Sequence, residues 1–360
     1  MIEWLLVDDK PDEAEQFARA LSVKGMFVVT SIRAKDAEDR LGKGELRPSG
    51  VLMDVDLSSE TGMRSTGPGM AQNIRVAQQR QSAPSFPIVR FSARARVLEN
   101  IGHDSSSDDV FDLKIEKDGL SEIARQKVVQ RQLFGVTEVY HAAGGEFDLL
   151  TFVGLDDKHW SLWGHLAFER EMANADRPHL KAGRIIRLLV HPGVLIDEDL
   201  LAIRLGIDRH QSKSWSQLLD ELAPIRYSGV ARDHFPRWWA RGLEDWWLDL
   251  SPPQPLAGSS IEERHALLTR YHSDLRRLEM PEESPGDRPW RTCLLTLEER
   301  EEIIPVDPSK GVRITPRETL PPWMDPFVAV LGRALQSRDD PRLDRADLDR
   351  LSRWAKRGSR

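Results

Sequence analysis

The sequence predicts an α/β domain, built on a five-stranded doubly wound parallel sheet, followed by a mainly α-helical, tryptophan-rich region. Across residues 4–130, short apolar runs alternate with segments whose apolar residues recur at helical spacing. Several of these runs end abruptly in polar side chains, as buried parallel strands do at the edge of a sheet. Ten of the eleven tryptophans lie beyond residue 133, where helical spacing dominates.

The apolar runs and the segments between them have the lengths of strands and helices. The first helix, Pro11–Leu21, opens with proline and acids, as the first turn of a helix prefers. Parallel neighbours need crossover connections, so five strands with helices between them predict a doubly wound sheet. The expected strands are 4–7, 26–30, 51–53, 87–91 and 110–113, and the further helices are 34–41, 70–80 and 120–132.

Polar residues follow four of the five predicted strands. Asp8 and Asp9 follow the first strand, and Asp54 follows the third. Ser92 ends the fourth strand and Lys114 ends the fifth. Because the carboxyl ends of parallel strands meet at one edge of a sheet, these side chains are expected to converge there.

This set, in this order, resembles the receiver domain of two-component response regulators over residues 1–132. The resemblance implies a flavodoxin-like fold in which Asp54 is the phosphoacceptor. It further implies that Asp8 and Asp9 hold Mg2+ together with Asp54, and that Asp56 offers its backbone carbonyl to the metal.

The same resemblance gives roles to the residues of the last two strands. It makes Ser92 the hydroxyl that closes on the phosphoryl group and Lys114 its counter-charge. Phe111, three positions before that lysine, would be the aromatic switch residue. The chain departs from the family at Ile115, where the family has a proline after the lysine, so the loop there is expected to be less constrained.

Phosphorylation of a carboxylate explains why these residue types are needed. A carboxylate is a weak nucleophile with the same sign of charge as a phosphoryl group, so a divalent cation has to bridge the two. The acyl phosphate then adds roughly two negative charges, which draw the hydroxyl and the lysine into new hydrogen bonds. The expected outcome is a switch.

Length and composition set the domain count and the compartment. A chain of 360 residues predicts two domains or three, here 1–132 and 133–360 with a sub-boundary near 251–260. The net charge of -7 argues against coating nucleic acid by bulk charge. A single cysteine, Cys293, and an N-terminus unlike a signal peptide favour a cytoplasmic protein without a membrane segment.

The region after residue 133 is expected to be mostly helical. A strand-like or buried piece spans 147–153, just past a Gly-Gly pair. Apolar faces at helical spacing follow. They predict helices at 163–173, 182–190, 198–205, 235–250, 261–280 and 338–360.

Residues 201–215 resemble a helix-turn-helix, in which Arg209, Gln211 and Lys213 of the second helix would face DNA. Ser212 stands where an apolar residue should pack inward. The alternative is a plain corner between two helices of a bundle.

The tryptophan-rich segment 235–247 suggests a partner-docking surface made of Trp238, Arg237 and Arg241, because Trp and Arg dominate interface energetics. Core packing of the large rings is the alternative.

Together these features predict a response-regulator-like signalling protein, phosphorylated on Asp54 to control a helical effector domain that binds a protein partner. A sensor histidine kinase or phosphotransfer protein would supply the phosphoryl group. One alternative is a DNA-binding transcriptional regulator that uses 201–215, with a homodimer of the receiver also open. The second is a degenerate receiver that serves as a constitutive docking scaffold. No motif predicts an enzyme beyond self-phosphorylation and dephosphorylation at Asp54.

Overall fold

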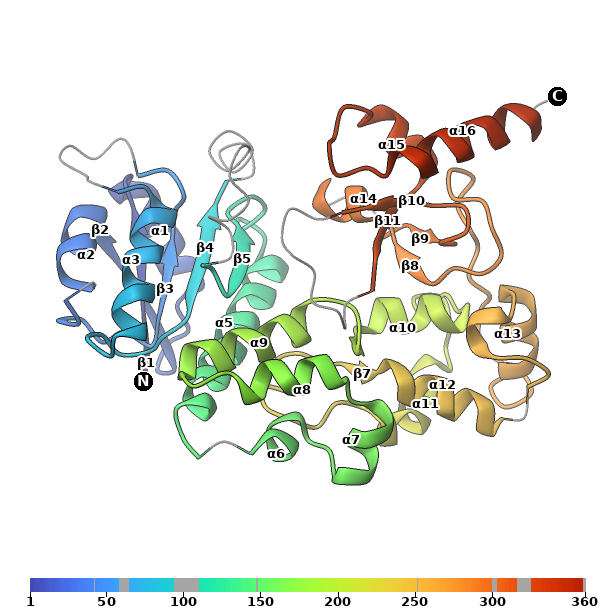
Figure 1. Ribbon diagram of the computed structural model, residues 1–360, viewed down its shortest axis with the longest axis horizontal. Coiled ribbons are helices and arrows are strands. Elements are labelled where there is room, and N and C mark those ends of the chain that lie inside the picture. Colours follow the sequence, from blue (N-terminus) through green and yellow to red (C-terminus); the bar gives the residue numbers. More distant parts are fainter. Residues whose placement is uncertain are drawn as a thin grey trace. The chain divides into compact units, whose positions relative to one another are not determined.

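The chain forms two compact units, and neither is one continuous stretch of sequence (Figure 1). The computed structural model describes residues 1–41, 43–57, 65–93, 110–146, 148–250, 252–299, 303–315 and 325–358. The first unit comprises Met1–Asp156, Glu169–Val190 and Ser228–Phe235, and the second comprises the remainder. The predicted boundary at residue 132 lies within helix α5, Ile123–Ala143.

The first unit is built on a five-stranded sheet with the order β2-β1-β3-β4-β5. All of its pairings are parallel. This order is one of the two common doubly wound arrangements, the flavodoxin-like one, so the predicted fold class is confirmed. The strands are β1 Ile2–Asp8, β2 Phe27–Arg33, β3 Gly50–Met53, β4 Ile88–Ser92 and β5 Leu113–Glu116.

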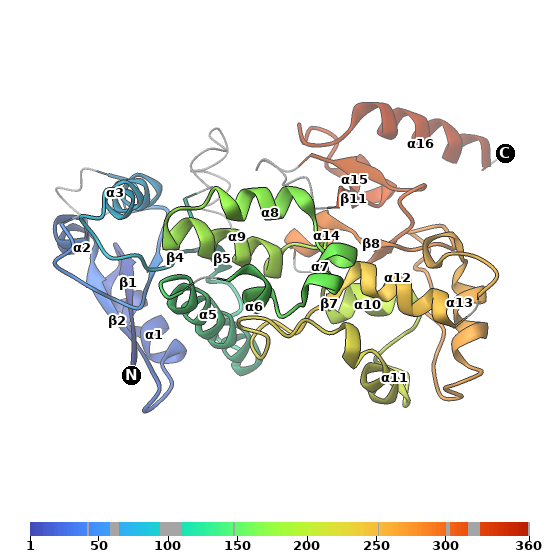
Figure 2. The same ribbon diagram turned by 60° about the horizontal axis from the view of Figure 1, so that its bottom comes forward.

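Helices cover both faces of this sheet (Figure 2). Helices α1, Pro11–Leu21, and α2, Ala34–Leu41, begin and end at the predicted residues. Helix α3 spans Gly67–Gln79. Residues from α2, α3 and the central strands share one core cluster, which includes Ala37, Met53 and Ile74. Helix α1 packs against α5 on the other face.

Strand β5 differs from its prediction, because it begins at Leu113 and ends at Glu116 rather than spanning 110–113. Asp112 explains the shift. Its backbone N–H donates to the carbonyl of Ile88, and its side chain accepts from the N–H of the same residue at 2.8 Å. These bonds set the start of the ladder with β4, so Phe111 packs into the core ahead of the strand.

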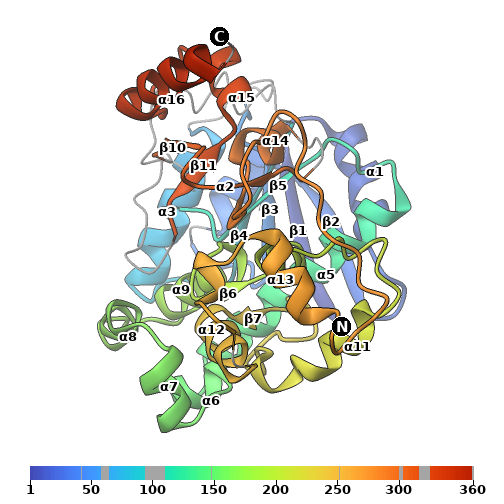
Figure 3. The same cartoon turned by 90° about the vertical axis from the view of Figure 1, so that its right-hand side faces the viewer.

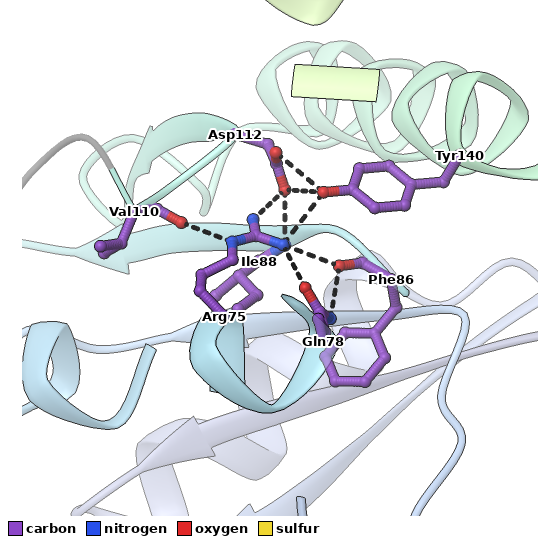
Figure 4. Close-up of polar contacts among 7 residues, drawn as sticks. All are labelled: Arg75, Gln78, Phe86, Ile88, Val110, Asp112 and Tyr140. Atoms are coloured by element: carbon purple, nitrogen blue, oxygen red, sulfur yellow. Dashed lines mark hydrogen bonds and ion pairs between the residues drawn. The ribbon is translucent and has the colours of Figure 1, made fainter. Parts of the chain in front are cut away.

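A polar network ties α3 and α5 to the amino-terminal end of β4, at the sheet edge opposite the ends of β1 and β3 (Figure 4). The Arg75 guanidinium donates to Asp112 at 2.6 Å and to the Tyr140 hydroxyl at 3.1 Å. The Tyr140 hydroxyl donates to Asp112 at 2.9 Å. Burial and the carboxylate of Asp112 raise the pKa of Tyr140, while Arg75 opposes that rise.

Helix α5 continues past the predicted end at residue 132. The remaining segments of the first unit pack against this helix. One of them is α9, Pro178–Val190. Gly135 allows the 228–235 segment to come close, since a Cβ there would lie 2.5 Å from the ring of Phe235. Glu138 accepts a hydrogen bond from the backbone N–H of Ala231 at 3.1 Å.

The strand-like alternative for 147–153 is wrong, because this piece is helix α6, Leu149–Val153. Asp148 caps it by accepting from the N–H of Thr151, and Gly154 ends it in the left-handed conformation. Its last two residues are buried, as the other half of that prediction expected.

The second unit consists of short helices and three two-stranded pairs. One core gathers around Leu205, Leu218 and Trp247, and another around Val312 and Val328. Figure 3 shows the terminal helix beside the β10–β11 pair. The strands are β6 Leu195–Ile196, β7 Trp238–Trp239, β8 Arg291–Thr292, β9 Pro305–Val306, β10 Val312–Ile314 and β11 Phe327–Ala329. The helices are α7 Asp157–Trp163, α10 Glu198–Leu205, α11 Trp215–Glu221, α12 Ala240–Asp249, α13 Ile261–Leu268, α14 Leu294–Glu299, α15 Leu331–Gln336 and α16 Arg345–Gly358. Helix α8, Leu166–Ala173, has residues in both units.

Several predicted helices of this region are shorter than expected. Helix α10 matches 198–205, but the helix predicted over 261–280 ends at Leu268, where the hydroxyl of Thr269 bonds back to the carbonyl of His265. The predicted helix over 235–250 starts only at Ala240, because Trp238 and Trp239 pair with β6. Within the described residues, no helix has the length and apolar character needed to cross a membrane.

Candidate phosphoacceptor site

Three of the predicted site residues meet at the carboxyl edge of the sheet. Asp8 is the last residue of β1, Asp54 directly follows β3, and Ser92 is the last residue of β4. The register places Val7 beside Met53 and Met53 beside Arg90, so these strand ends are neighbours. The side chains of Asp8, Asp54 and Ser92 are all buried.

The ammonium group at this edge comes from Lys117, and not from Lys114 as predicted. Lys117 Nζ lies 2.5 Å from Asp8 Oδ2 and also forms an ion pair with Asp54 Oδ2. Lys114 lies inside β5, opposite Arg90. Because β5 ends later than predicted, the lysine that follows it is three positions further along the chain.

The same shift removes Phe111 from the position predicted for the aromatic switch. The residue three positions before Lys117 is Lys114, which stands on a strand next to Arg90. Phe111 is buried in the core cluster that faces α3. A lysine therefore stands where the resemblance led us to expect an aromatic ring.

Hydrogen bonds hold the Asp54 carboxylate in one orientation. The Ser92 hydroxyl donates to Asp54 Oδ1 at 2.5 Å, and the Asp56 N–H lies 3.4 Å from the same oxygen. Asp8 Oδ1 accepts from the N–H of Lys10 at 2.9 Å. Both oxygens of Asp54 are thus contacted by groups that can donate to a phosphoryl oxygen as well.

Burial and charge pairing act in opposite directions on the pKa values of Asp8 and Lys117. It raises the pKa of Asp8, although the charge of Lys117 works in the opposite direction. Burial would lower the pKa of Lys117, but the carboxylates of Asp54 and Asp8 outweigh it and the pKa is raised. Lys117 therefore stays protonated between the two acids.

The acids fit a divalent metal ion. Asp8, Asp9 and Asp54 each offer a carboxylate oxygen, and these oxygens lie within 4.8 Å of one another. Three carboxylates beside the ammonium of Lys117 leave an excess of two negative charges, which suits a cation with all-oxygen ligands such as Mg2+. A role for the backbone carbonyl of Asp56 stays a prediction.

Gly67 allows the start of α3 to approach Asp54. Its N–H donates to the carbonyl of Val55 at 3.0 Å, and a Cβ on Gly67 would lie 1.8 Å from the backbone oxygen of Asp54. No side chain can absorb that overlap, since the obstructing atom belongs to the backbone. The position of Asp54 thus depends on a glycine that the resemblance does not assign.

We expect Gly67→Ala to displace the Asp54 backbone and to weaken Mg2+ binding by at least about tenfold. A loss of roughly 1.4 kcal/mol in binding free energy is enough for that change. Tryptophan fluorescence during Mg2+ titration measures it. Gly69→Ala is the matched control on the same helix, since a Cβ there would meet nothing closer than 3.4 Å. Equal Mg2+ affinity in the two variants would contradict the steric argument.

The residues predicted to face DNA are not on a helix. Helix α10 ends at Leu205 and α11 begins only at Trp215, so the predicted second helix is wrong. The Asp208 side chain accepts from the N–H groups of two following residues and bends the segment. Arg209 forms ion pairs with Glu198 and Asp199, and the Gln211 side chain donates to Asp208. The backbone N–H of Lys213 donates to the backbone carbonyl of Asp274.

Trp238, the tryptophan of the predicted partner surface, does not lie on the surface. Trp238 is buried in the core of the second unit, with the guanidinium of Arg226 over its ring. Arg241 is half-exposed and pairs with Glu244 and Asp245 of its own helix. Arg237 donates a hydrogen bond to the neighbouring carbonyl of Pro236.

Comparison with models of known protein families gives no match, and comparison with curated proteins gives none. Solved structures with a similar region include the chemotaxis protein CheY4 of Vibrio cholerae, at 16% identity and a TM-score of 0.25, covering 36% of this chain and 98% of that chain. A LuxR-family two-component response regulator from an Aurantimonas species has 19% identity and a TM-score of 0.26, covering 37% of this chain and 85% of its own. RcsB from Salmonella enterica serovar Typhimurium has 13% identity and a TM-score of 0.27, covering 57% of this chain and 94% of its own.

Similarities at these identities and TM-scores do not decide the fold of this chain. The strand order β2-β1-β3-β4-β5, which the sheet shows by itself, gives the first unit the flavodoxin-like fold of a receiver domain.

Proposed function

We propose that this chain is a response-regulator-like signalling protein, phosphorylated on Asp54 by a sensor histidine kinase or a phosphotransfer protein. One observation carries the proposal. Ser92 and Lys117 both contact the carboxylate of Asp54, beside two further acids suited to a divalent cation. A buried ion pair between Asp54 and Lys117 could simply stabilise the fold. It would not require a hydroxyl on the same carboxylate or two further acids close enough to share a metal ion.

In the proposed reaction, a carboxylate oxygen of Asp54 attacks the phosphorus of a phosphohistidine. The new bond is the acyl phosphate, and the phosphorus–nitrogen bond breaks with its electron pair left on the imidazole. The Ser92 hydroxyl donates to a phosphoryl oxygen, and Lys117 offsets the added charge. Asp8, Asp9 and Asp54 would hold Mg2+, which would supply positive charge to offset that of the phosphoryl group.

Phosphorylation would change which atoms Lys117 and Ser92 contact. In the unmodified protein, Lys117 is held between Asp8 and Asp54. A phosphoryl group on Asp54 offers both side chains stronger acceptors, so the ends of β4 and β5 would shift with them. The second unit would then act as the effector that binds a protein partner. No described helix supports the DNA-binding alternative.

Intact mass after incubation with Mg2+ and a small acyl-phosphate donor tests the proposal. We expect a labile adduct of one phosphoryl group, absent without Mg2+ and absent from Asp54→Asn. Asp36→Asn, on the exposed side of α2, is the control and should keep the adduct. Wild-type protein without an adduct would instead make the first unit a docking scaffold that keeps only the fold.

A further inference from the structure

The second unit buries three arginines close together. They are Arg204 on α10, Arg264 on α13 and Arg291 on β8, with exposed fractions of 2%, 0% and 7%. Burying a charged group is costly unless an opposite charge and hydrogen bonds compensate for it. Among the described residues, one carboxylate, that of Asp325, forms ion pairs with any of the three.

Asp325 bridges two of these arginines and faces solvent. Its Oδ2 lies 2.9 Å from Arg204 Nη2, and it forms an ion pair with Arg291 Nη2 as well. The side chain of Asp325 is 32% exposed, whereas both arginines are buried. The carboxylate therefore covers the guanidinium groups on their solvent side.

A tryptophan ring holds the arginines in place. The guanidinium carbon of Arg204 lies 4.4 Å from the ring centroid of Trp290, and that of Arg264 lies 5.8 Å from it. Arg264 Nη1 also donates to the carbonyls of Arg204 and Pro289, at 3.0 and 3.1 Å. The positive groups are thus fixed in position without further acids.

The cluster has more donors and more positive charge than its acceptors use. In the described part of the chain, Arg204 Nε and the Nε and Nη2 atoms of Arg264 have no hydrogen-bond partner. Burial lowers the pKa of Arg264 to about 10, although the charges of Asp287 and Asp307 oppose this shift. Burial, and next the charge of Arg291, lowers the pKa of Arg204 to about 10. Buried donors without partners in the protein are groups to which a bound ion or water can accept hydrogen bonds.

We propose that Arg204 and Arg291 form a binding site for a phosphate group, and that Asp325 occupies this site when no phosphate is bound. Guanidinium groups bind phosphate through paired N–H donors. A phosphate carries up to two negative charges and more acceptor oxygens than one carboxylate, so it would compensate the three arginines better than Asp325 does. Displacing the partly exposed Asp325 would open the site.

Isothermal titration with inorganic phosphate, in metal-free buffer with chloride at matched ionic strength, tests this site apart from Asp54. We expect Asp325→Asn to bind phosphate about tenfold more tightly than wild type, because a charged competitor worth at least about 1.4 kcal/mol has been removed. Adenosine monophosphate is the second arm. Tighter binding of it than of phosphate would identify a phosphate monoester, and the reverse would identify free phosphate.

Two further variants decide whether the effect belongs to this cluster. Asp344→Asn is the matched control, since Asp344 has a similar exposure of 31% and pairs with Arg313 in the same unit. Adding Arg291→Lys to Asp325→Asn keeps the charge but removes the planar fork, and should reverse the gain in affinity. Equal phosphate affinity in Asp325→Asn and Asp344→Asn, or no binding of either ligand to Asp325→Asn, would overturn the proposal.

Discussion

Replacing Lys117 with methionine is expected to slow phosphoryl transfer to Asp54 by about 100-fold, since one preorganised donor to a developing charge is worth roughly 10²–10³ in rate. Lys117 is placed to act in this way, because its ammonium already contacts Asp54 and Asp8. The time course of the intact-mass adduct, with a small acyl-phosphate donor and saturating Mg2+, measures the rate.

The same variant should bind Mg2+ more tightly. Without Lys117, the three carboxylates lose the cation that competes for two of them, and a gain of about tenfold corresponds to roughly 1.4 kcal/mol. A slower reaction together with tighter Mg2+ binding separates loss of charge from general damage to the site, which would weaken both.

Lys114→Met is the matched control, three positions earlier on β5. Because Lys114 lies opposite Arg90 within the strand, its loss should change the transfer rate by less than about threefold, since substitutions away from critical contacts usually cost less than about 0.5 kcal/mol. A 100-fold loss in Lys114→Met with a normal rate in Lys117→Met would restore the assignment that the sequence first suggested.

Arg75→Met is expected to lower the free energy of unfolding by about 3–5 kcal/mol, because removing one member of a buried ion pair leaves the other uncompensated. Here the uncompensated group is Asp112, which bonds to the start of β4 and to Tyr140. Urea unfolding followed by tryptophan fluorescence measures the change. Arg80→Met, at the exposed end of the same helix, should change it by less than about 0.5 kcal/mol.

Tyr140→Phe tests the same network with a smaller change. It removes one hydroxyl that donates to Asp112 and accepts from Arg75, so about 1–3 kcal/mol is expected. If Arg75→Met costs no more than Arg80→Met, the network does not support the fold. Arg75 lies at the edge of the sheet opposite Asp54. The folded fraction of Arg75→Met should therefore still accept a phosphoryl group on Asp54.

Local signals explain which elements the sequence predicted well. Proline and acids in the first turn mark the start of α1, and the cap at Asp197 explains why α10 begins at the predicted residue 198. The acid cluster was predicted for a similar reason: an apolar run ending in a carboxylate needs no knowledge of the rest of the chain.

The position of β5 shows where such signals fail. The run 110–113 is more apolar than the strand itself, Leu113–Glu116, and therefore looks more like a buried strand. The lysine that follows this run is Lys114, whereas the lysine that follows the strand is Lys117. A correct signal was present in the alternation of Leu113 and Ile115 with Lys114 and Glu116, which fits a strand with two different faces. One shift of three residues thus accounts for both the Lys114 and the Phe111 corrections.

The polar networks could not be predicted from the sequence, because the residues that form them are far apart along the chain. Arg75 and Asp112 are 37 residues apart, and Asp112 and Tyr140 are 28 apart. Arg204 and Asp325 are separated by 121 residues. Only the packing of whole elements brings these side chains together, and no spacing rule for a single helix or strand reports it.

The discontinuous first unit has a consequence for synthesis on the ribosome. Its last segment, Ser228–Phe235, packs where Gly135 leaves room on α5, so these contacts form only after that segment has left the exit tunnel. A nascent chain that ends at residue 132 would lack Leu133, Val136 and Tyr140, which are buried in the finished unit. The first unit is therefore completed only after Phe235, about two thirds of the way along the chain, has emerged.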